Sequence, residues 1–330
     1  MGGLAIKNAY TRRYSRKEYD AIVPEIIEKA KKLFTHATDT RFYFEKESFG
    51  DADILCLVDK PITIDIEQWI YDEFNSKEVV KNSSVYSFEY KELQVDFILT
   101  PKRNYETSYV YFSFNDLHNL IGKLFHKFGL KWGFDGLKYV YRIDGKRLGI
   151  IDVCSDYRKA LQFVDLCPDR YDRGFKNLQE IFDYVKSSKY FNPWMFDLEN
   201  FNRINRERDK KRNTYSKFLE YVEQFKNDNK EDYHYFYPDK KVYLGHIDYY
   251  FPGFLKEYRN LEKKEERLRE VHEKFNGNIL IDEFGITGKD LGNLISRFKA
   301  LFEDLNSFQE FVLANNKETI LNKVKTILSE

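Results

Sequence analysis

The spacing of apolar residues divides the chain into a mixed N-terminal part and a helical C-terminal part. Apolar residues recur every three or four positions where helices are predicted, and they alternate or run together where strands are predicted. Up to residue 155 the predicted helices cover 15–35, 63–74 and 115–128, and the predicted strands cover 54–58, 85–90, 93–99 and 109–113. Residues 40–44 are predicted as a strand or turn, and 129–155 as a meander of short strands. The predicted elements after residue 156 are helices, over 176–185, 199–225, 254–275, 289–305 and 317–328.

This order of elements predicts an α+β fold with two domains, residues 1–155 and residues 156–330. We expect the first domain to be a mixed sheet with helices on one face, and the second to be all-helical. The composition, with 42% hydrophobic and 33% charged residues, is that of a globular protein. The net charge is zero, so any affinity for nucleic acid must come from a local patch.

The cysteines and the hydropathy indicate where the protein works. Cys56, Cys154 and Cys167 are few, which favours a reducing compartment and buried thiols over a disulfide partner or a zinc site. The six histidines show no metal-ligand spacing with the cysteines. No apolar run reaches about 18 residues, and no apolar signal follows Met1. We therefore expect a cytoplasmic protein with no membrane partner.

Three aspartates are the candidate chemistry of the N-terminal part. Asp51 and Asp53 precede a buried apolar run, and their spacing places both on one face of a strand. Asp96 is the single acid in another apolar strand. Buried acids are costly without a cation between them, so the pattern predicts a site for two Mg²⁺ ions, or Mn²⁺. The alternative is that Asp51 is a turn residue and that Asp53 faces solvent.

Three sequence blocks carry a family resemblance over roughly residues 40–145. Residues 47–55, ESFGDADIL, resemble the palm motif of the DNA polymerase beta nucleotidyltransferase superfamily. Residues 94–102, QVDFILTPK, are similar to its third-carboxylate strand. Residues 111–119, YFSFNDLHN, resemble the Tyr-Phe turn and following helix of family X DNA polymerases. The resemblance implies a nucleotidyltransferase palm in residues 1–155.

The resemblance also implies roles for individual residues. Asp51, Asp53 and Asp96 would be the catalytic, metal-binding residues, and Asp96 would also orient a 3′-hydroxyl. The implied contacts to a nucleoside triphosphate come from Ser48 and Gly50 at the phosphates, Tyr111 and Phe112 at the sugar, and Asp116 and Asn119 at the base. Alternatively, Tyr111 and Phe112 pack in the core, and Asn119 is a solvated helix residue.

The chain departs from the superfamily in one place. A Gly-Ser pair usually lies about ten residues before the first aspartate of that superfamily, and here Thr40 and Arg41 occupy the position. We expect Thr40 to supply the hydroxyl and Arg41 a charge to the phosphates. Only about 40 residues precede the motif, so we expect the DNA-gap-binding half of family X enzymes to be missing.

Two C-terminal segments are candidate polynucleotide contacts. Residues 203–217 hold seven cationic side chains and two acidic ones. The candidate nucleic-acid-binding residues there are Arg203, Arg206, Arg208, Lys210, Lys211, Arg212 and Tyr215. Residues 275–279 and 285–292 are similar to the C-terminal body of bacterial-type CCA-adding enzymes and poly(A) polymerases. The alternatives are a solvated helix face for the first segment and a packing turn for the second.

The sequence therefore predicts a two-metal nucleotidyltransferase that adds nucleotides to a nucleic-acid 3′ end. It would be template-independent or of the tRNA type, acting on RNA with a tRNA-like 3′ end. The first alternative is a family X-like DNA polymerase that acts on DNA 3′ ends or gaps. The others are a non-catalytic nucleic-acid-binding protein with this fold and a nucleotidyltransferase that modifies a protein or small molecule. The aromatic residues 233–237 would stack bases or pack in a loop.

Overall fold

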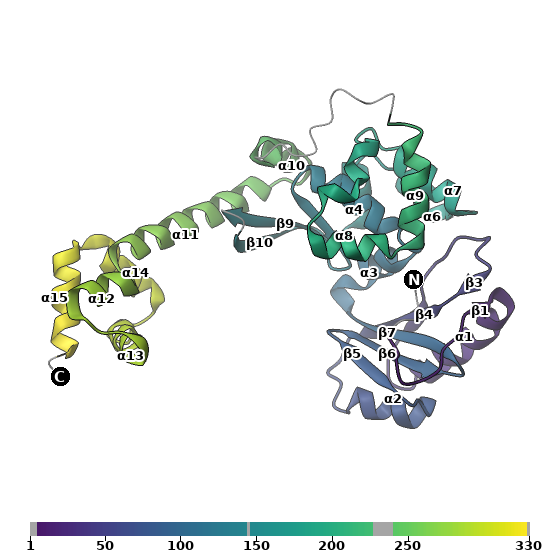
Figure 1. The fold of residues 1–330 in the computed structure, drawn as a ribbon, viewed down its shortest axis with the longest axis horizontal. Helices are drawn as coiled ribbons and strands as arrows, with labels where there is room; N and C mark the ends of the chain where they lie inside the picture. Colours follow the sequence, from purple (N-terminus) through teal and green to yellow (C-terminus); the bar gives the residue numbers. More distant parts are fainter. Residues whose placement is uncertain (1–4, 144–145, 227–239, 329–330) are drawn as a thin grey trace. The chain divides into compact units, whose positions relative to one another are not determined.

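A five-stranded mixed sheet organises the N-terminal part of the computed structural model, which describes residues 5–143, 146–226 and 240–328 (Figure 1). In sheet order its strands are β2 (Ala37–Asp39), β4 (Asp51–Val58), β7 (Leu93–Pro101), β6 (Val85–Tyr90) and β5 (Val79–Asn82). β4 and β7 are parallel, and the other neighbours are antiparallel. The predicted strands over 54–58, 85–90 and 93–99 are confirmed. Two short strands, β1 (Tyr14–Ser15) and β3 (Ser48–Phe49), pair separately.

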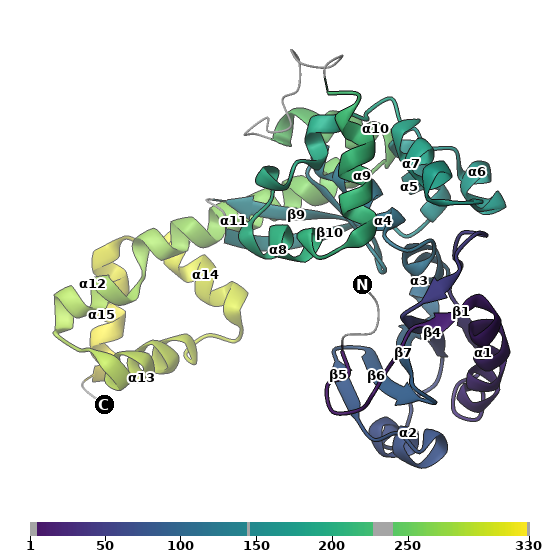
Figure 2. The same cartoon turned by 45° about the vertical axis from the view of Figure 1, so that its right-hand side comes forward.

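Helices α1 (Arg16–Ala30) and α2 (Ile66–Phe74) cover one face of this sheet (Figure 2). Alternate residues of β4, from Ala52 to Cys56, are buried with the apolar stripes of both helices in one core. A capping box formed by Ser15 and Glu18 begins α1, and Pro24 lies within the helix. Because one face of β4 is committed to this core, Asp51 and Asp53 are left on the other face.

Tyr109–Ser113 was the one predicted strand of this part that is wrong. The segment up to Phe112 belongs to helix α3 (Tyr105–Phe112), which follows a 3₁₀ turn, η1 (Lys102–Asn104), and Ser113 is the extended residue that ends the helix. A short run of aromatic and β-branched residues does not distinguish a strand from a buried helix. Tertiary contacts decide here, because the Thr107 and Ser108 hydroxyls donate to the carbonyls of Ser155 and Phe134.

The next part of the chain joins a three-stranded sheet to a group of helices. The predicted helix over 115–128 is α4 (Leu117–Lys127), and the predicted meander is β8 (Leu130–Gly133), β9 (Gly136–Ile143) and β10 (Lys146–Cys154). The helices that follow are α5 (Tyr157–Phe163), α6 (Pro168–Arg173), α7 (Leu178–Lys186), α8 (Arg203–Lys210), α9 (Asn213–Glu223) and α10 (Leu244–Tyr250), with 3₁₀ turns η2 (Pro193–Phe196), η3 (Leu198–Asn200) and η5 (Lys240–Tyr243).

The single helix predicted over 199–225 is wrong. The chain leaves helical geometry at Arg212, which lies between α8 and α9 with φ −94° and ψ 110°. Arg212 forms an ion pair with Asp116, and its neighbour Asp209 is held by Lys123. These tertiary ion pairs stabilise the break between the two helices. The charged residues of 203–217 do not by themselves predict it.

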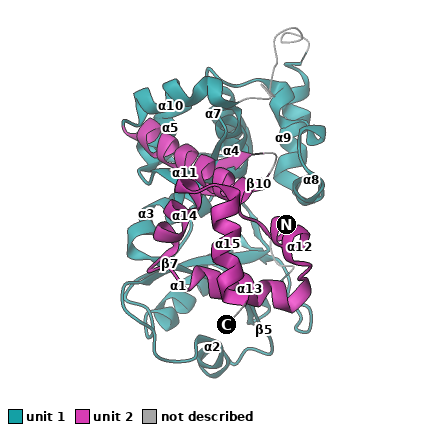
Figure 3. Ribbon diagram, turned by 90° about the vertical axis from the view of Figure 1, so that its left-hand side faces the viewer, with its two compact units in different colours: residues 1–140, 150–252 teal, residues 141–149, 253–330 magenta. Residues whose placement is uncertain are grey.

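The described residues form two compact units (Figure 3). The first takes residues from 1–140 and 150–252, and the second from 141–149 and 253–330. The second unit contains α11 (Phe254–Lys274), α12 (Gly277–Phe284), α13 (Gly288–Lys299), α14 (Leu305–Ala314) and α15 (Lys317–Leu328), around a core that includes Phe275, Phe298 and Phe308. The helix predicted over 289–305 is shorter than expected, since α13 ends at Lys299.

Secondary structure changes near residue 155 as predicted, since β10 ends at Cys154 and the described elements beyond it are helical. This confirms the α+β fold class. The functional division at residue 155 stays a prediction, and the aromatic run 233–237 lies outside the described residues. Among the described residues, no helix combines the length and apolar character needed to cross a membrane.

The core that fixes the sheet gives a stability prediction. Phe97 of β7 is fully buried and packs against the rings of Phe34, Trp69, Phe74 and Phe88. We expect Phe97→Ala to lower the free energy of unfolding by about 3–5 kcal/mol. Urea unfolding followed by tryptophan fluorescence measures this. Phe44→Ala, at a 76% exposed position, is the matched control, and equal losses in both variants would contradict the packing described.

Candidate metal centre

Three carboxylates converge on the face of the sheet that is opposite the α1–α2 core. The parallel register of β4 and β7 places Asp53 directly beside Asp96, and Asp51 beside Gln94. One oxygen from each of Asp51, Asp53 and Asp96 lies within 4.8 Å of the other two. All three side chains are half-buried. The predicted convergence is confirmed, and the alternative of a turn residue and a solvent-facing residue is excluded.

Burial and the neighbouring negative charges raise the pKa values of Asp53 and Asp96. The pKa of Asp53 is raised well above its usual value, first by burial and then by the charges of Asp51 and Asp96, while Lys46 opposes the rise. Burial and Asp51 raise the pKa of Asp96 to about 6, although hydrogen bonds from Ser87 and Gln94 oppose the rise. A divalent cation such as Mg²⁺ prefers carboxylate oxygens as ligands, and its charge would relieve the repulsion between the three carboxylates. The residues present therefore fit a metal ion.

Gln94 holds one member of the group in place. Its amide nitrogen donates to both carboxylate oxygens of Asp96, at 3.0 and 3.2 Å. Its own amide oxygen accepts the backbone N–H of Ala5 at 3.0 Å. Gln94 is 2% exposed, and its partly buried hydrogen bonds to Asp96 orient that carboxylate. The sequence pattern marked Gln94 only as a polar residue in an apolar strand.

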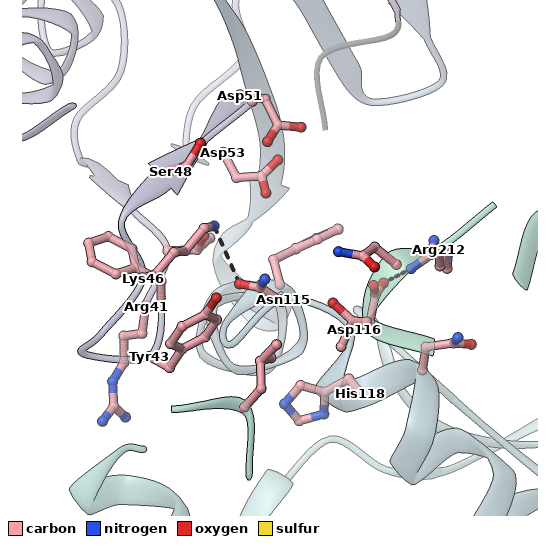
Figure 4. Close-up of a pocket in the computed structure, with 18 of the residues that line it drawn as sticks. Arg41, Tyr43, Lys46, Ser48, Asp51, Asp53, Asn115, Asp116, His118 and Arg212 are labelled. Carbon is pink, nitrogen blue, oxygen red and sulfur yellow. Dashed lines mark hydrogen bonds and ion pairs between the residues drawn. The ribbon is translucent and has the colours of Figure 1, made fainter. Parts of the chain in front are cut away.

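A cavity of about 850 Å³ is lined both by carboxylates and by residues of the basic segment, 203–217 (Figure 4). Asp51 and Asp53 line it, and so do the cations Arg208, Lys211, Arg212 and Lys217, from the region of α8 and α9. The residues predicted to contact a nucleotide also line it, namely Arg41, Ser48, Gly50, Tyr111, Phe112, Asp116 and Asn119. Segments more than 150 residues apart in the sequence thus share one cavity. The roles assigned to these residues stay predictions.

The remaining residues of the basic segment lie elsewhere. Arg203, Arg206 and Lys210 do not line the cavity. The Arg206 guanidinium donates to the Leu198 and Phe201 carbonyls, both at 3.2 Å. Tyr215 is fully buried, and its hydroxyl donates to the Phe196 carbonyl at 2.7 Å. The ring of Tyr215 therefore packs in the interior of the protein, and its predicted contact with nucleic acid stays a prediction.

A buried ion pair that the sequence did not reveal stabilises the basic wall of the cavity, which is formed by Arg208, Lys211, Arg212 and Lys217. Lys123 of α4 and Asp209 of α8 lie 2.9 Å apart, with side chains 3% and 0% exposed. Asn119 donates to Asp209 at 3.2 Å, and Arg208 donates to Asn119 at 3.4 Å. Asp116 pairs with Arg212, and its predicted place near a base stays a prediction. Asp116 and Asn119 therefore link α4 to the basic segment in this structure.

Two further cations that the sequence did not single out line the cavity, Lys46 in the loop before β3 and Arg13 directly before β1. Lys46 donates to Asn115 at 3.4 Å, and burial lowers its pKa although Asp51 and Asp53 oppose the change. Arg13 donates to the Ser48 hydroxyl at 2.8 Å, which holds Ser48 at the cavity wall. The signal available for Lys46 was its position five residues before Asp51.

Arg41 is turned from the place expected for it. Its guanidinium donates to the Asp172 carbonyl at 2.7 Å and lies 4.6 Å above the ring of Phe114. Figure 4 shows this group pointing away from Asp51 and Asp53. Thr40 is buried, and its backbone N–H donates to the Asp53 carbonyl at 3.2 Å. The segment at the Gly-Ser position therefore supports β4 through its backbone.

The thiols divide by burial. Cys56 is buried, and burial raises its pKa. Cys154 is half-buried and Cys167 is exposed, so the expectation of three buried thiols is wrong for Cys167. All three are free.

No protein-family model and no curated protein matches the chain, so the geometry of the site carries the functional argument.

The raised carboxyl pKa values predict how stability depends on pH without metal. Because Asp53 and Asp96 keep protons to a higher pH when folded, the folded state binds more protons than the unfolded state above about pH 4. Their effect on the free energy of unfolding therefore becomes more unfavourable from about pH 4 through about pH 6 and above. In EDTA, we expect the thermal midpoint of Asp53→Asn to rise relative to wild type as pH increases.

The same scans with Mg²⁺ test the metal directly. Magnesium should raise the midpoint of the wild-type protein at pH 7.5 and leave that of Asp53→Asn unchanged. Asp282→Asn, at an exposed position on α12, is the control and should follow wild type in both scans. A wild-type midpoint that ignores Mg²⁺ would contradict a metal centre.

Proposed function

We propose that this protein is a metal-dependent nucleotidyltransferase that adds nucleotides to the 3′ end of a nucleic acid. The observation that carries the proposal is the shared cavity, which has metal-capable carboxylates on one wall and Arg208, Lys211, Arg212 and Lys217 on another. A nucleoside triphosphate and a polynucleotide are both polyanions, and their reaction brings the two negative groups together. That chemistry needs both the carboxylate wall and the cationic wall. The cavity volume of about 850 Å³ is within the range of ligand sites.

The carboxylates would hold the metal, and the chain's other groups would place the reactants. Asp51, Asp53 and Asp96 would bind Mg²⁺, which supplies charge neutralisation at the phosphates and lowers the pKa of a bound hydroxyl. Asp96, oriented by Gln94, would align the 3′-hydroxyl. The 3′-oxygen would attack the α-phosphorus, form the new phosphodiester bond and release pyrophosphate.

The cavity wall supplies groups for the nucleotide itself. Ser48 and Gly50 would approach the triphosphate, and Lys46 would contribute a positive charge between the loop and the carboxylates. Tyr111 and Phe112, at the end of α3, would lie against the sugar. Their edge-to-face contact, at 5.3 Å between ring centroids, would give the sugar a rigid surface.

For the polynucleotide, we propose RNA with a tRNA-like 3′ end. The family X-like DNA polymerase is the second candidate. Residues 111–119 resemble that family, and Tyr111 and Phe112 line the cavity. A non-catalytic nucleic-acid-binding protein would keep the basic wall but would not need the carboxylates.

A transfer assay tests the proposal. Labelled ribonucleoside triphosphates with tRNA and Mg²⁺ should give 3′ extension, and Asp53→Asn should reduce the rate by about a thousandfold or more, because it removes a metal ligand. Asp282→Asn should keep the wild-type rate. Extension of gapped DNA with deoxynucleotides alone would replace the RNA proposal with the DNA one. Binding without any transfer would leave the non-catalytic alternative.

The basic wall gives a separate prediction for polynucleotide affinity. Lys211→Ala and Lys217→Ala should each weaken binding and lower the slope of log affinity against log salt by about 1, if each contacts one phosphate. Lys210→Ala is the matched control, because Lys210 lies beside Lys211 but does not line the cavity. Equal effects at Lys210 and Lys211 would show a diffuse charge effect and not a phosphate contact in the cavity.

A further inference from the structure

A second cavity, of about 360 Å³, adjoins the first and has a different chemistry. The two share Thr40, Arg41 and Phe42, but the second is lined by no residue of the acidic triad. Its lining includes Arg16, Arg41 and Arg173, with Asp39 as its one carboxylate. This cavity is therefore suited to an anion, and nothing in the proposed transfer chemistry uses it.

Two of its guanidinium groups are available to such an anion. Among the described residues, neither Arg41 nor Arg173 forms an ion pair, whereas Arg16 pairs with Asp20 at 2.8 Å. Arg41 donates to a neutral partner, the carbonyl of Asp172. Gly174 keeps space beside it, since a Cβ there would lie 3.0 Å from the Arg41 Nη2. The charge of Arg41 is thus directed by the protein and is not neutralised by an acid.

The walls of this cavity are fixed by backbone contacts. The N–H groups of Phe44 and Glu45 donate to the carbonyls of Phe175 and Lys176, at 2.9 and 2.8 Å. Phe114 adopts a left-handed conformation, with φ 61°, which is unfavourable for a residue with a side chain. In that conformation its N–H donates to the Arg41 carbonyl at 2.6 Å, and its ring lies under the Arg41 guanidinium. The unfavourable backbone conformation of Phe114 thus occurs where that residue contacts Arg41.

An exposed aromatic ring completes the site. Phe44 lines the cavity and is 76% exposed. A solvent-exposed ring beside guanidinium groups is the combination that binds single-stranded nucleic acid, because the ring stacks on a base while the cations bind phosphate. Tyr109 lines the same cavity. The chemistry that fits is one nucleotide unit, with its base and its phosphate.

We infer that the second cavity binds one nucleotide unit of the single-stranded polynucleotide whose 3′ end is extended at the first cavity. Its phosphate lies on Arg41 and Arg173, and its base stacks on Phe44. This inference rests on the proposed function for the identity of the ligand. The second cavity would thus contact the polynucleotide at a nucleotide other than the one that reacts.

The test measures binding without metal, so that it does not depend on catalysis. The full chain is titrated in EDTA into a labelled single-stranded oligouridylate of about ten nucleotides, followed by fluorescence anisotropy. Phe44→Ala and Arg173→Ala should each raise the dissociation constant by about tenfold, because one stacked base or one phosphate contact is lost. Both positions are exposed, so neither substitution should prevent folding.

The controls remove the same kinds of group elsewhere in the first unit. Tyr249→Ala deletes an 84% exposed ring, and Lys17→Ala deletes an exposed cation beside Arg16 that lines neither cavity. Both should bind as wild type does. Wild-type binding by Phe44→Ala and Arg173→Ala would overturn the inference. If Phe44→Ala and Arg173→Ala weakened the binding of adenosine 5′-monophosphate by the same factor as that of the oligouridylate, the inference would also be overturned. The second cavity would then be a site for a free nucleotide.

The outcome is separable from that of the transfer assay. If no nucleotide is transferred but Phe44→Ala and Arg173→Ala lose affinity, the second site stands and the proposed function fails. If transfer occurs and both variants bind normally, the proposed function stands and the second site fails.

Discussion

The parallel pairing of β4 with β7 is the constraint on which the rest of the site depends. It sets Asp53 beside Asp96, and the two-residue period of a strand adds Asp51 to the same face. Without a cation this arrangement is unfavourable, as the raised pKa values of Asp53 and Asp96 record. The apolar core on the other face, with α1 and α2, supplies the stability that keeps the acids together. The sheet therefore holds three mutually repelling carboxylates in an arrangement that could hold a metal ion.

A second charge arrangement positions the opposite wall of the cavity. The buried Lys123–Asp209 pair fixes α8 against α4, and removing one partner of such a pair is strongly destabilising because the other charge stays buried. Phe201 also packs on the ammonium group, 3.6 Å from its ring centroid. The ion pair thus carries the cations of the basic segment to the cavity, where they face Asp51 and Asp53. An acidic wall set against a basic wall is an arrangement suited to an anion that carries metal ions.

The sequence predicted what depends on local pattern and failed where tertiary contacts decide. The strands around Asp51, Asp53 and Asp96 follow from apolar runs interrupted by single acids, and the α+β order follows from periodicity. Tyr109–Phe112 are helical as part of α3, and the Thr107 and Ser108 hydroxyls at the start of that helix donate to carbonyls far along the chain. The break at Arg212, the burial of Tyr215 and the role of Asp209 depend on partners in α4 and in the turns around Phe196, which no local pattern specifies. Arg41 was predicted to carry a functional charge, and only the structure shows that its guanidinium turns from the triad.

Electron paramagnetic resonance of bound Mn²⁺, recorded with a non-hydrolysable nucleoside triphosphate, tests the central claim most directly. It asks whether one site holds both the metal and the phosphates. The account predicts a bound Mn²⁺ signal with hyperfine coupling to ³¹P, and the loss of that signal when Asp53 is replaced by Asn. Mn²⁺ that binds without phosphorus coupling, or that binds equally well to the Asp53→Asn variant, would contradict the account.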